Sequence, residues 1–313
     1  MLEVFQYLRR IHAVILHTCL CSQRPLCLTN QVDFTPQRVV SLQPSVTATL
    51  DRLGLLERVV ACTKYCVDVC PALRKHKKLI VADSWTAQAR QILAAKPDFV
   101  IASVPYQLEA VAEIMKAGIP FLGFAPHSLN DVYADIARIA NLMGVPERGI
   151  RLINDMQDEV TRVRKLTEAK LERNKRPLVY CEEWGKPLIH SQGWVKELVE
   201  ATGGEFLGTP GARTDAETIR KADPEIIIAA WCGARDRVPL EKIIPARGWQ
   251  ETKAAREGRV YCINDEYLNT PAPTLIDGLH CLAVAIQPDS TDVPHGLRRI
   301  QRIHQETSPA GVE

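Results

Sequence analysis

The stretch that decides the fold is residues 146–174, PERGIRLINDMQDEVTRVRKLTEAKLERN. Proline is favoured at the first position of a helix, where its missing N–H costs no hydrogen bond. Apolar residues then recur in steps of three and four, the spacing of one helix face. They are Ile150, Ile153, Met156, Val160, Val163 and Leu166, and the pattern ends at Leu171. At 1.5 Å per residue the predicted helix is about 40 Å long, enough to cross a whole domain.

Short apolar runs alternate with helical patterns on both sides of this helix, which is typical of a parallel α/β fold. Before it, strands are predicted at 38–42, 58–62, 98–102 and 119–123, and helices at 45–53, 88–95, 107–117 and 129–143. Residues 63–86 are predicted to be irregular. After it, strands are predicted at 178–181, 225–230 and 259–263, and helices at 194–202, 216–222 and 273–286.

One passage occurs in similar form on both sides of the long helix. Residues 95–102 read AKPDFVIA and residues 222–229 read ADPEIIIA, each a helix end, a proline and a buried strand. This internal repeat predicts two related lobes joined by the long helix. The expected division is a leader or poorly ordered segment at 1–36, an N-terminal α/β lobe at 37–145, the bridging helix at 146–174, a C-terminal α/β lobe at 175–288 and a tail at 289–313.

Composition limits the function classes. The chain has 313 residues, of which 46% are hydrophobic, and a formal net charge of +2. This charge gives no reason to expect a nucleic-acid partner, and no apolar run is long enough to span a bilayer. Near the N-terminus, residues 11–21 follow Arg9 and Arg10 but are interrupted by His12 and His17. They do not form a convincing signal peptide, so an envelope and a cytoplasmic location both stay open.

Aromatic residues gather where strands of the two predicted lobes end. In open parallel sheets ligands bind beyond the carboxyl ends of the strands. A cleft lined by aromatic rings suits a large, flat, partly apolar ligand, whereas the alternative is that these rings close the ends of two cores. The candidate ligand-binding residues are Tyr65, Trp85, Tyr106, Trp184, Trp231 and Tyr267.

Metal-binding and catalytic patterns are weaker. Cys62, Cys66 and Cys70 are spaced four apart, but Pro71 follows and no fourth ligand is near, so no metal site is predicted. The sequence lacks G-x-G-x-x-G, G-x-x-x-x-G-K-[ST], H-E-x-x-H and G-x-S-x-G. An enzyme that uses cleft carboxylates for acid–base chemistry is kept as an alternative. Its candidate groups are Glu182, Glu183, Asp265 and Glu266.

Several short motifs together resemble the periplasmic-binding-protein family for iron–siderophore, haem and vitamin B12. They are RVVSLQPSVT at 38–47, KPDFVIA at 96–102, AGIP at 117–120, GG at 203–204, DPEIII at 223–228 and GRVY at 258–261. The resemblance extends over about residues 38–288 and includes the long helix. It implies two Rossmann-like lobes, each with a mainly parallel sheet, bridged by one rigid helix. It further implies a non-enzymatic, monomeric protein in the periplasm or cell envelope that holds its ligand between the lobes and delivers it to an ABC importer.

Within this family the chain looks most like the cobalamin binders. Tyr65, Trp85, Trp184 and Tyr267 stand where those proteins place aromatic contacts to the corrin, and Tyr106 and Trp231 are expected at the rim. The resemblance therefore implies cobalamin or a related corrinoid as ligand, with no catalytic cofactor. Haem stays an alternative because Tyr65 or His127 would serve as an axial ligand. A siderophore is less expected, because no Arg cluster stands out beyond Arg235 and Arg237.

The resemblance also implies docking on the importer through one surface carboxylate on each lobe. Glu217 matches this position in the second lobe, but Arg90 occupies the corresponding position in the first. Like charges at a docking surface repel, so a stand-alone corrinoid-binding protein is the alternative. Since a helix without an internal kink resists bending, and Gly149 lies only in its first turn, we expect a cleft that is largely formed before the ligand arrives.

Overall fold

The computed structural model describes residues 34–75, 78–82, 86, 88–103, 108–170 and 176–287, and 293–301 near the C-terminus. From Thr35 on, these residues belong to one compact unit. The predicted leader lies outside the described residues except for residues 34–36. None of the described helices combines the length and apolar character needed to cross a membrane.

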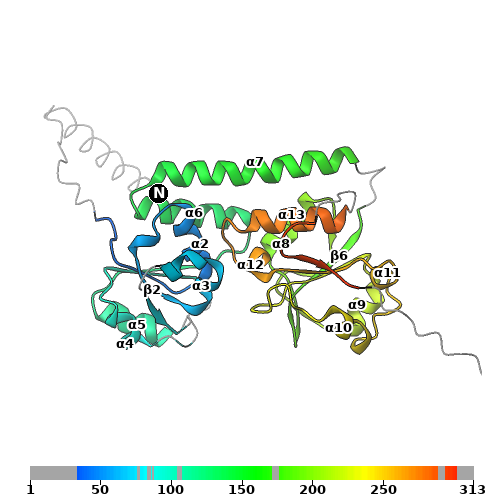
Figure 1. Ribbon diagram of the computed structural model, residues 1–313, viewed down its shortest axis with the longest axis horizontal. Coiled ribbons are helices and arrows are strands. Elements are labelled where there is room, and N and C mark those ends of the chain that lie inside the picture. The colour runs from blue at the N-terminus through cyan, green and yellow to red at the C-terminus, as the bar shows by residue number, and fades with distance from the viewer. Residues whose placement is uncertain are drawn as a thin grey trace, which may run out of the picture. The chain divides into compact units, whose positions relative to one another are not determined.

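The first lobe is built on a five-stranded parallel sheet (Figure 1). Its strand order is β3-β2-β1-β4-β5, with buried side chains on both faces of the central strands. The strands are β1 (Val39–Ser41), β2 (Val59–Thr63), β3 (Leu79–Val81), β4 (Phe99–Ser103) and β5 (Phe121–Phe124). The helices are α2 (Pro44–Arg52), α3 (Lys64–Val69), α4 (Ala89–Ala94), α5 (Leu108–Lys116) and α6 (Leu129–Leu142), with short 3₁₀ turns at Leu56–Arg58 and Pro71–Lys75.

The prediction that residues 63–86 are irregular was wrong. This segment contains α3, the 3₁₀ turn at Pro71–Lys75 and the edge strand β3. Thr63 starts α3, because its side chain accepts a hydrogen bond from the backbone N–H of Cys66 at 3.3 Å. Cys66 is the only residue of α3 that is fully buried. A helix with one buried position has no apolar periodicity, so the sequence pattern could not reveal it.

The second lobe contains a seven-stranded mixed sheet. Its central strands β6 (Leu178–Gly185), β10 (Ile226–Ala229) and β11 (Val260–Ile263) are parallel to one another, as is β8 (Glu205–Phe206) to β6. Antiparallel strands lie toward its edges, namely β7 (Leu188–His190), β9 (Arg213–Thr214) and β12 (Leu297–Arg299). The helices are α8 (Gly193–Ala201), α9 (Ala216–Ala222), α10 (Leu240–Ala246), α11 (Lys253–Arg256), α12 (Asp265–Leu268) and α13 (Leu275–Ile286).

The segment expected to be a tail contributes a strand. β12 pairs antiparallel with β11, where Leu297 lies opposite Ile263. Three residues with one apolar side chain carry too short an alternation to be recognised as a strand. This strand is stabilised by pairing with the edge of an existing sheet and not by an apolar alternation of its own.

The repeated passage has the same backbone course in both lobes. Lys96 follows α4 with φ +49°, and Asp223 follows α9 with φ +48°. In each case a proline comes next and leads into a buried strand, β4 or β10. A non-glycine residue in the left-handed region is uncommon, so its recurrence supports the prediction of two related lobes.

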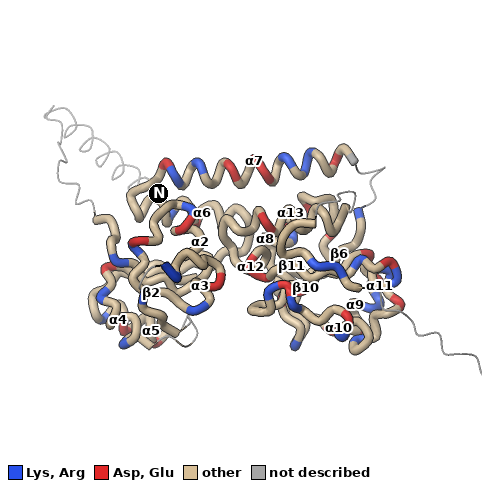
Figure 2. The backbone as a smooth tube through the Cα atoms, in the orientation of Figure 1, with Lys and Arg blue, Asp and Glu red and all other residues tan. Residues whose placement is uncertain are grey.

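The helix α7 (Pro146–Lys170) packs against α6 of the first lobe and against α8 and α13 of the second (Figure 1). Met156, Val160 and Val163 are buried, as predicted. Ile150 and Leu166 were predicted on the same face but are 51% and 52% exposed. Residues of both charge signs occur along the length of the helix (Figure 2). Predicted residues 171–174 lie outside the described residues.

Gly149 sets how closely α7 approaches α6. A Cβ at this position would lie 2.4 Å from the Cβ of Ala140, well inside contact distance. We therefore expect Gly149→Ala to destabilise the protein by about 1–2 kcal/mol, because overpacking outweighs the better helix propensity of alanine. Urea unfolding measures the change. Arg151→Ala on the exposed side of the same helix is the control, and equal or greater stability of Gly149→Ala would contradict the expectation.

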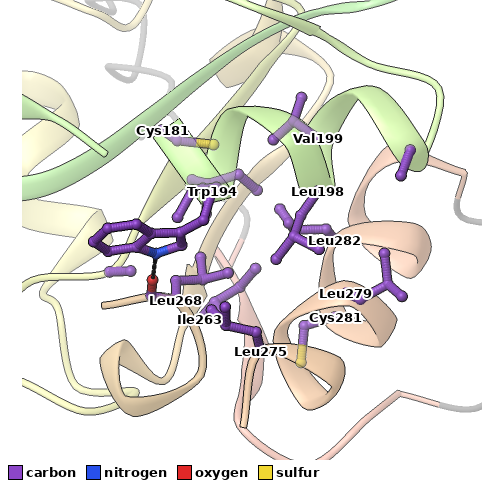
Figure 3. Close-up of a cluster of buried hydrophobic side chains, with 14 of the residues drawn as sticks. Cys181, Trp194, Leu198, Val199, Ile263, Leu268, Leu275, Leu279, Cys281 and Leu282 are labelled. Carbon is purple, nitrogen blue, oxygen red and sulfur yellow. Dashed lines mark hydrogen bonds between the residues drawn. The ribbon is translucent and has the colours of Figure 1, made fainter. Parts of the chain in front are cut away.

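The main core of the second lobe fills the space between α7, α8, α13 and the sheet. Trp194 is buried in it, and its indole N–H donates to the carbonyl of Leu268 at 2.7 Å (Figure 3). Cys181 and Cys281 lie in the same core and are free thiols. Both thus pack as small buried hydrophobic side chains.

Candidate functional site

A cavity of about 490 Å³ lies between the two lobes. The first lobe contributes α2, α3 and the start of the following 3₁₀ turn, and the second lobe contributes the loop after β10, α12, the start of α13 and the loop before β12. The lining residues are Ala48, Asp51, Arg52, Asp68, Val69, Cys70, Pro71, Arg235, Asp236, Asn264, Glu266, Tyr267, Thr274, Asp277, His295 and Gly296.

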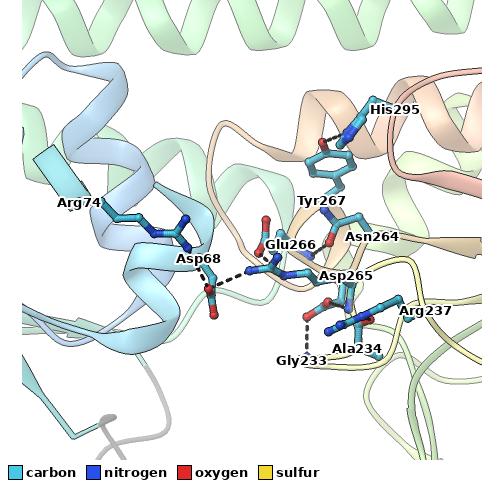
Figure 4. Close-up of polar contacts among 11 residues, drawn as sticks. Asp68, Arg74, Gly233, Ala234, Arg237, Asn264, Asp265, Glu266, Tyr267 and His295 are labelled. Carbon is cyan, nitrogen blue, oxygen red and sulfur yellow. Dashed lines mark hydrogen bonds and ion pairs between the residues drawn. The ribbon is translucent and has the colours of Figure 1, made fainter. Parts of the chain in front are cut away.

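Charged groups dominate this cavity. The acidic side chains outnumber the arginines, Arg52 and Arg235, and are Asp51, Asp68, Asp236, Glu266 and Asp277. The phenol oxygen of Tyr267 lies 3.1 Å from Nδ1 of His295 (Figure 4). The close packing there depends on Gly296, since a Cβ at that position would lie 2.6 Å from the tyrosine ring. Tyr267, predicted as a ligand contact, therefore lines an interlobe cavity together with residues that the sequence did not single out.

One buried carboxylate fixes the loop that follows β10. Asp265 is buried and accepts backbone hydrogen bonds from Gly233 at 2.7 Å and from Arg235 at 2.6 Å. Burial raises the pKa of Asp265, and these two N–H donors act in the opposite direction. Both donors have left-handed backbones, with φ of +79° for Gly233 and +54° for Arg235. Because that conformation is unfavourable for arginine, the hydrogen bonds that these N–H groups donate to Asp265 help to hold it.

An ion pair joins the lobes at this cavity. Nη2 of Arg235 lies 2.8 Å from Oδ1 of Asp68 on α3, and Nε of Arg235 lies 3.7 Å from Oε1 of Glu266 (Figure 4). On the first lobe, Arg74 approaches the same carboxylate of Asp68 to 3.9 Å. Two carboxylates and two guanidinium groups thus alternate across the boundary between the lobes.

Two of the predicted aromatic contacts are exposed at strand ends. Tyr65 lies in α3, directly after β2, and is 39% exposed, with Nζ of Lys64 4.8 Å from its ring centre. Trp184 lies near the end of β6 and is 43% exposed, and its indole N–H donates to the carbonyl of Lys186 at 3.0 Å. Neither belongs to the lining of the 490 Å³ cavity. Trp85 and Tyr106 lie outside the described residues.

Trp231 follows β10 but is already engaged within its own lobe. Its indole N–H donates to Oε1 of Glu182 at 2.5 Å, and its ring covers Gly185, where a Cβ would lie 2.2 Å from the nearest ring carbon. The guanidinium of Arg247 lies 5.5 Å from the ring centre. The half-buried Trp231 therefore belongs to a network inside the second lobe, and its expected role at the rim stays a proposal.

Glu182 is the centre of that network. It is 1% exposed, and its Oε2 accepts from the phenol of Tyr180 at 2.7 Å and from Nη1 of Arg247 at 2.9 Å. Burial raises the pKa of Glu182, while Arg247 is the largest influence in the opposite direction. A carboxylate with three donors and almost no exposure is suited to holding strands and loops together.

The other carboxylates considered for acid–base chemistry also have partners. Glu183 accepts from the side-chain amide of Gln192 at 2.6 Å. Asp265 accepts the two loop N–H groups, and Glu266 lies beside Arg235. In the described structure, each of the four candidates thus has a structural contact of its own.

The three spaced cysteines lie together in the core of the first lobe. Cys62, Cys66 and Cys70 are buried free thiols in one apolar cluster. Among the described residues, no group of three or more His, Cys, Asp or Glu side chains is arranged to hold a metal ion.

The two positions considered for docking lie on helices of opposite lobes. Glu217 is exposed in the first turn of α9, and its carboxylate pairs with Arg220 on the same helix at 2.7 Å and with Lys221 at 3.6 Å. Arg90 is exposed on α4. Glu217 is thus not an isolated charge, because two neighbouring cations share it.

Sequence reasoning missed most of the cavity residues. Asp68 falls in the segment predicted to be irregular, and His295 falls in the predicted tail. Arg235 was named only as one of two arginines considered for a siderophore site. The spacing of Tyr65 and Asp68, three residues apart, would have placed them on one face if α3 had been recognised.

Known proteins resemble this chain in sequence and in fold. The family model described as periplasmic binding protein matches residues 39–267. An uncharacterized ABC transporter substrate-binding lipoprotein of Bacillus subtilis is 25% identical over 82% of this chain and 81% of its own length. The vitamin B12-binding protein of Pectobacterium carotovorum is 26% identical over 82% of this chain and 91% of its own length.

Solved structures share the fold. A periplasmic haem-binding protein of Pseudomonas aeruginosa superimposes with a TM-score of 0.76 at 20% identity, covering 85% of this chain and 98% of that one. The periplasmic vitamin B12-binding protein of Vibrio cholerae gives a TM-score of 0.65 at 21% identity, covering 82% of this chain and 98% of that one. These likenesses confirm two α/β lobes joined by a long helix.

Proposed function

This chain belongs to the periplasmic binding protein family, and we propose that it binds cobalamin or a related corrinoid between its two lobes. Members of this family are substrate-binding proteins and carry no catalytic cofactor. The function is thus reversible binding of a small molecule, without chemical conversion of it.

The observation that carries the proposal is a pair of exposed aromatic side chains, one in each lobe. Tyr65 follows β2 in the first lobe, and Trp184 lies near the end of β6 in the second. Both strands belong to parallel pairs, whose carboxyl ends are where ligands bind in such sheets. Large rings that are 39% and 43% exposed offer apolar surface to a flat macrocycle. Trp85 and Tyr106, with Trp231 and Tyr267, complete the proposed set.

The relatives favour a corrinoid over other ligands of the family. Proteins named for vitamin B12 or cobalamin binding match this chain in sequence over about four fifths of its length, among them one from Halobacterium salinarum at 24% identity over 81% of this chain. The haem-binding proteins are similar in fold, at 20–24% identity.

Delivery to an ABC importer, from a location in the cell envelope, is the proposed role. A lipoprotein relative named for ABC transport supports it. Glu217 is the proposed docking carboxylate of the second lobe. Docking would require the importer to compete with Arg220 and Lys221 for this side chain and to face Arg90 on the first lobe.

The test is a titration of the purified protein with cyanocobalamin, followed by tryptophan fluorescence and equilibrium dialysis. We expect saturable binding with one site per chain at micromolar ligand or below. Haem is titrated in parallel, because Tyr65 would be able to ligate iron. Saturable haem binding, with a Soret shift that is lost in Tyr65→Phe, and no cyanocobalamin binding would overturn the corrinoid assignment.

A further inference from the structure

The Asp68–Arg235 ion pair has a special position among the ion pairs of the described side chains. It is the one that connects the first lobe to the second, across the cavity between them. Other contacts between the lobes are of a different kind. The N–H of Leu129 on α6 donates to Glu197 on α8 at 3.2 Å, and Ala272 is buried in the apolar cluster of the first lobe. The pair therefore adds an ionic contact at the cavity itself.

Each partner keeps an opposite charge on its own lobe when the pair separates. Asp68 has Arg74 at 3.9 Å, and Arg235 has Glu266 at 3.7 Å. Opening the pair removes one contact and leaves each charge beside the partner that it already has on its own lobe. These remaining partners lower the free-energy cost of opening the pair, and a low cost is what a reversible switch needs.

Arg235 is placed for this contact by its own lobe. Asp265 holds the backbone N–H groups of Gly233 and Arg235, and the left-handed backbone at Arg235 turns the chain at that point. Strained backbone kept in place by a buried group is common at ligand sites. The second lobe thus holds the arginine backbone in place and leaves its side chain free to exchange partners.

The pair also lies beside the residues proposed to hold the ligand. Asp68 is three residues after Tyr65 on α3, so the two share one helix face. Arg235 is on the same loop as Trp231, and Tyr267 lines the same cavity as both members of the pair. A macrocycle packed on Tyr65 would reach this ion pair.

We propose that the Asp68–Arg235 pair is a latch between the lobes that a ligand opens on binding. The side chains of Arg235 and Asp68 are 43% and 40% exposed, so the latch is weak. Exposed ion pairs contribute little, and a ligand would lose only about two- to fivefold in affinity by opening it. This inference takes the identity of its ligand from the proposed function. The contact between Asp68 and Arg235 itself does not depend on which ligand binds.

The binding test compares Asp68→Asn, Arg235→Gln and the double variant with the unaltered protein, using cyanocobalamin as probe. We expect each single variant to bind about two- to fivefold more tightly, and the double variant to gain no more than either single one. Raising the salt concentration should tighten binding to the unaltered protein, because salt screens the exposed pair, and should have little effect on the variants. Glu109→Gln and Arg237→Gln are controls that remove exposed charges outside the cavity lining.

Hydrogen exchange of the ligand-free proteins tests the latch without any ligand. We expect faster amide exchange in α3 and in the loop at 231–236 in Asp68→Asn and Arg235→Gln than in the two controls. Unchanged exchange in both segments would overturn the latch. If exchange responds as expected but neither cyanocobalamin nor haem binds any variant, the latch stands and the proposed function fails.

A third result would also overturn the proposal. If Arg235→Gln weakens cyanocobalamin binding while Asp68→Asn strengthens it, Arg235 contacts the ligand directly and Asp68 merely competes for it. Parallel effects of the two variants are therefore the signature of a latch.

Discussion

Replacement of Arg247 by methionine is expected to destabilise the protein by about 3–5 kcal/mol, because it leaves a buried carboxylate without its cation. Arg247 donates to Glu182 at 2.9 Å and to the carbonyl of Gly185 at 3.1 Å. Its guanidinium also lies 4.8 Å from the ring centre of Trp249, in a space that methionine fills only in part. Chemical unfolding at neutral pH measures the loss.

The pH dependence identifies the cause of this loss. Burial already raises the pKa of Glu182, and removal of Arg247 takes away the largest opposing influence. The folded variant then binds a proton more tightly than the unfolded chain does, so its stability falls as pH rises above the unfolded-state pKa of glutamate, about 4.3. We expect the loss to be smaller at pH 5 than at pH 8. A loss that does not depend on pH would point to packing alone.

Two further variants bracket the result. Glu182→Gln combined with Arg247→Met removes both charges and should recover part of the stability. Arg220→Ala breaks the exposed pair with Glu217 on α9 and should cost less than about 1 kcal/mol. If the double variant is less stable than Arg247→Met, the buried charge is not the source of the loss.

Removal of the two exposed aromatic rings is expected to weaken cyanocobalamin binding strongly. Tyr65→Ala and Trp184→Ala should each cost about 1–2 kcal/mol of binding free energy, as aromatic contacts at interfaces do, which is about a 5- to 30-fold rise in Kd. Since the rings come from different lobes, the two losses should add in the double variant. Equilibrium dialysis measures the affinity of each variant for cyanocobalamin.

The fold should survive these substitutions, because both side chains are exposed. Their unfolding free energies should stay within about 0.5 kcal/mol of the unaltered protein. Met115→Ala on α5 removes a side chain that is 64% exposed and serves as the control. An unchanged Kd in the double variant would remove Tyr65 and Trp184 from the site, even if the protein binds cyanocobalamin.

Long elements with many buried positions could be predicted from the sequence. The alternation of strands and helices around α7 produced the correct fold class, and the internal repeat at residues 95–102 and 222–229 reappears as two left-handed residues before prolines. Short elements could not be predicted, because α3 and β12 have too few buried positions for a period. Their stability comes from a capping threonine and from an existing sheet edge.

The candidate site divides in the same way. Sequence identified Tyr65, Trp184 and Tyr267 as aromatic residues near strand ends, since position along a parallel strand fixes which edge of the sheet a residue lies on. It could not indicate that Trp231 and Glu182 are partners inside one lobe, because their contact joins positions 49 residues apart. Nor could it show that α7 packs closely on α6 because Gly149 lacks a Cβ. This close packing depends on the position of Ala140 on the neighbouring helix.

The sequence by itself determined two α/β lobes and the long helix between them, because apolar periodicity specifies which faces must be buried. Only the tertiary structure decided that Asp68 meets Arg235 across the cavity. That contact depends on the relative position of two lobes and on a loop held by Asp265. Neither follows from local propensity, since an ion pair between distant segments leaves no period in the chain.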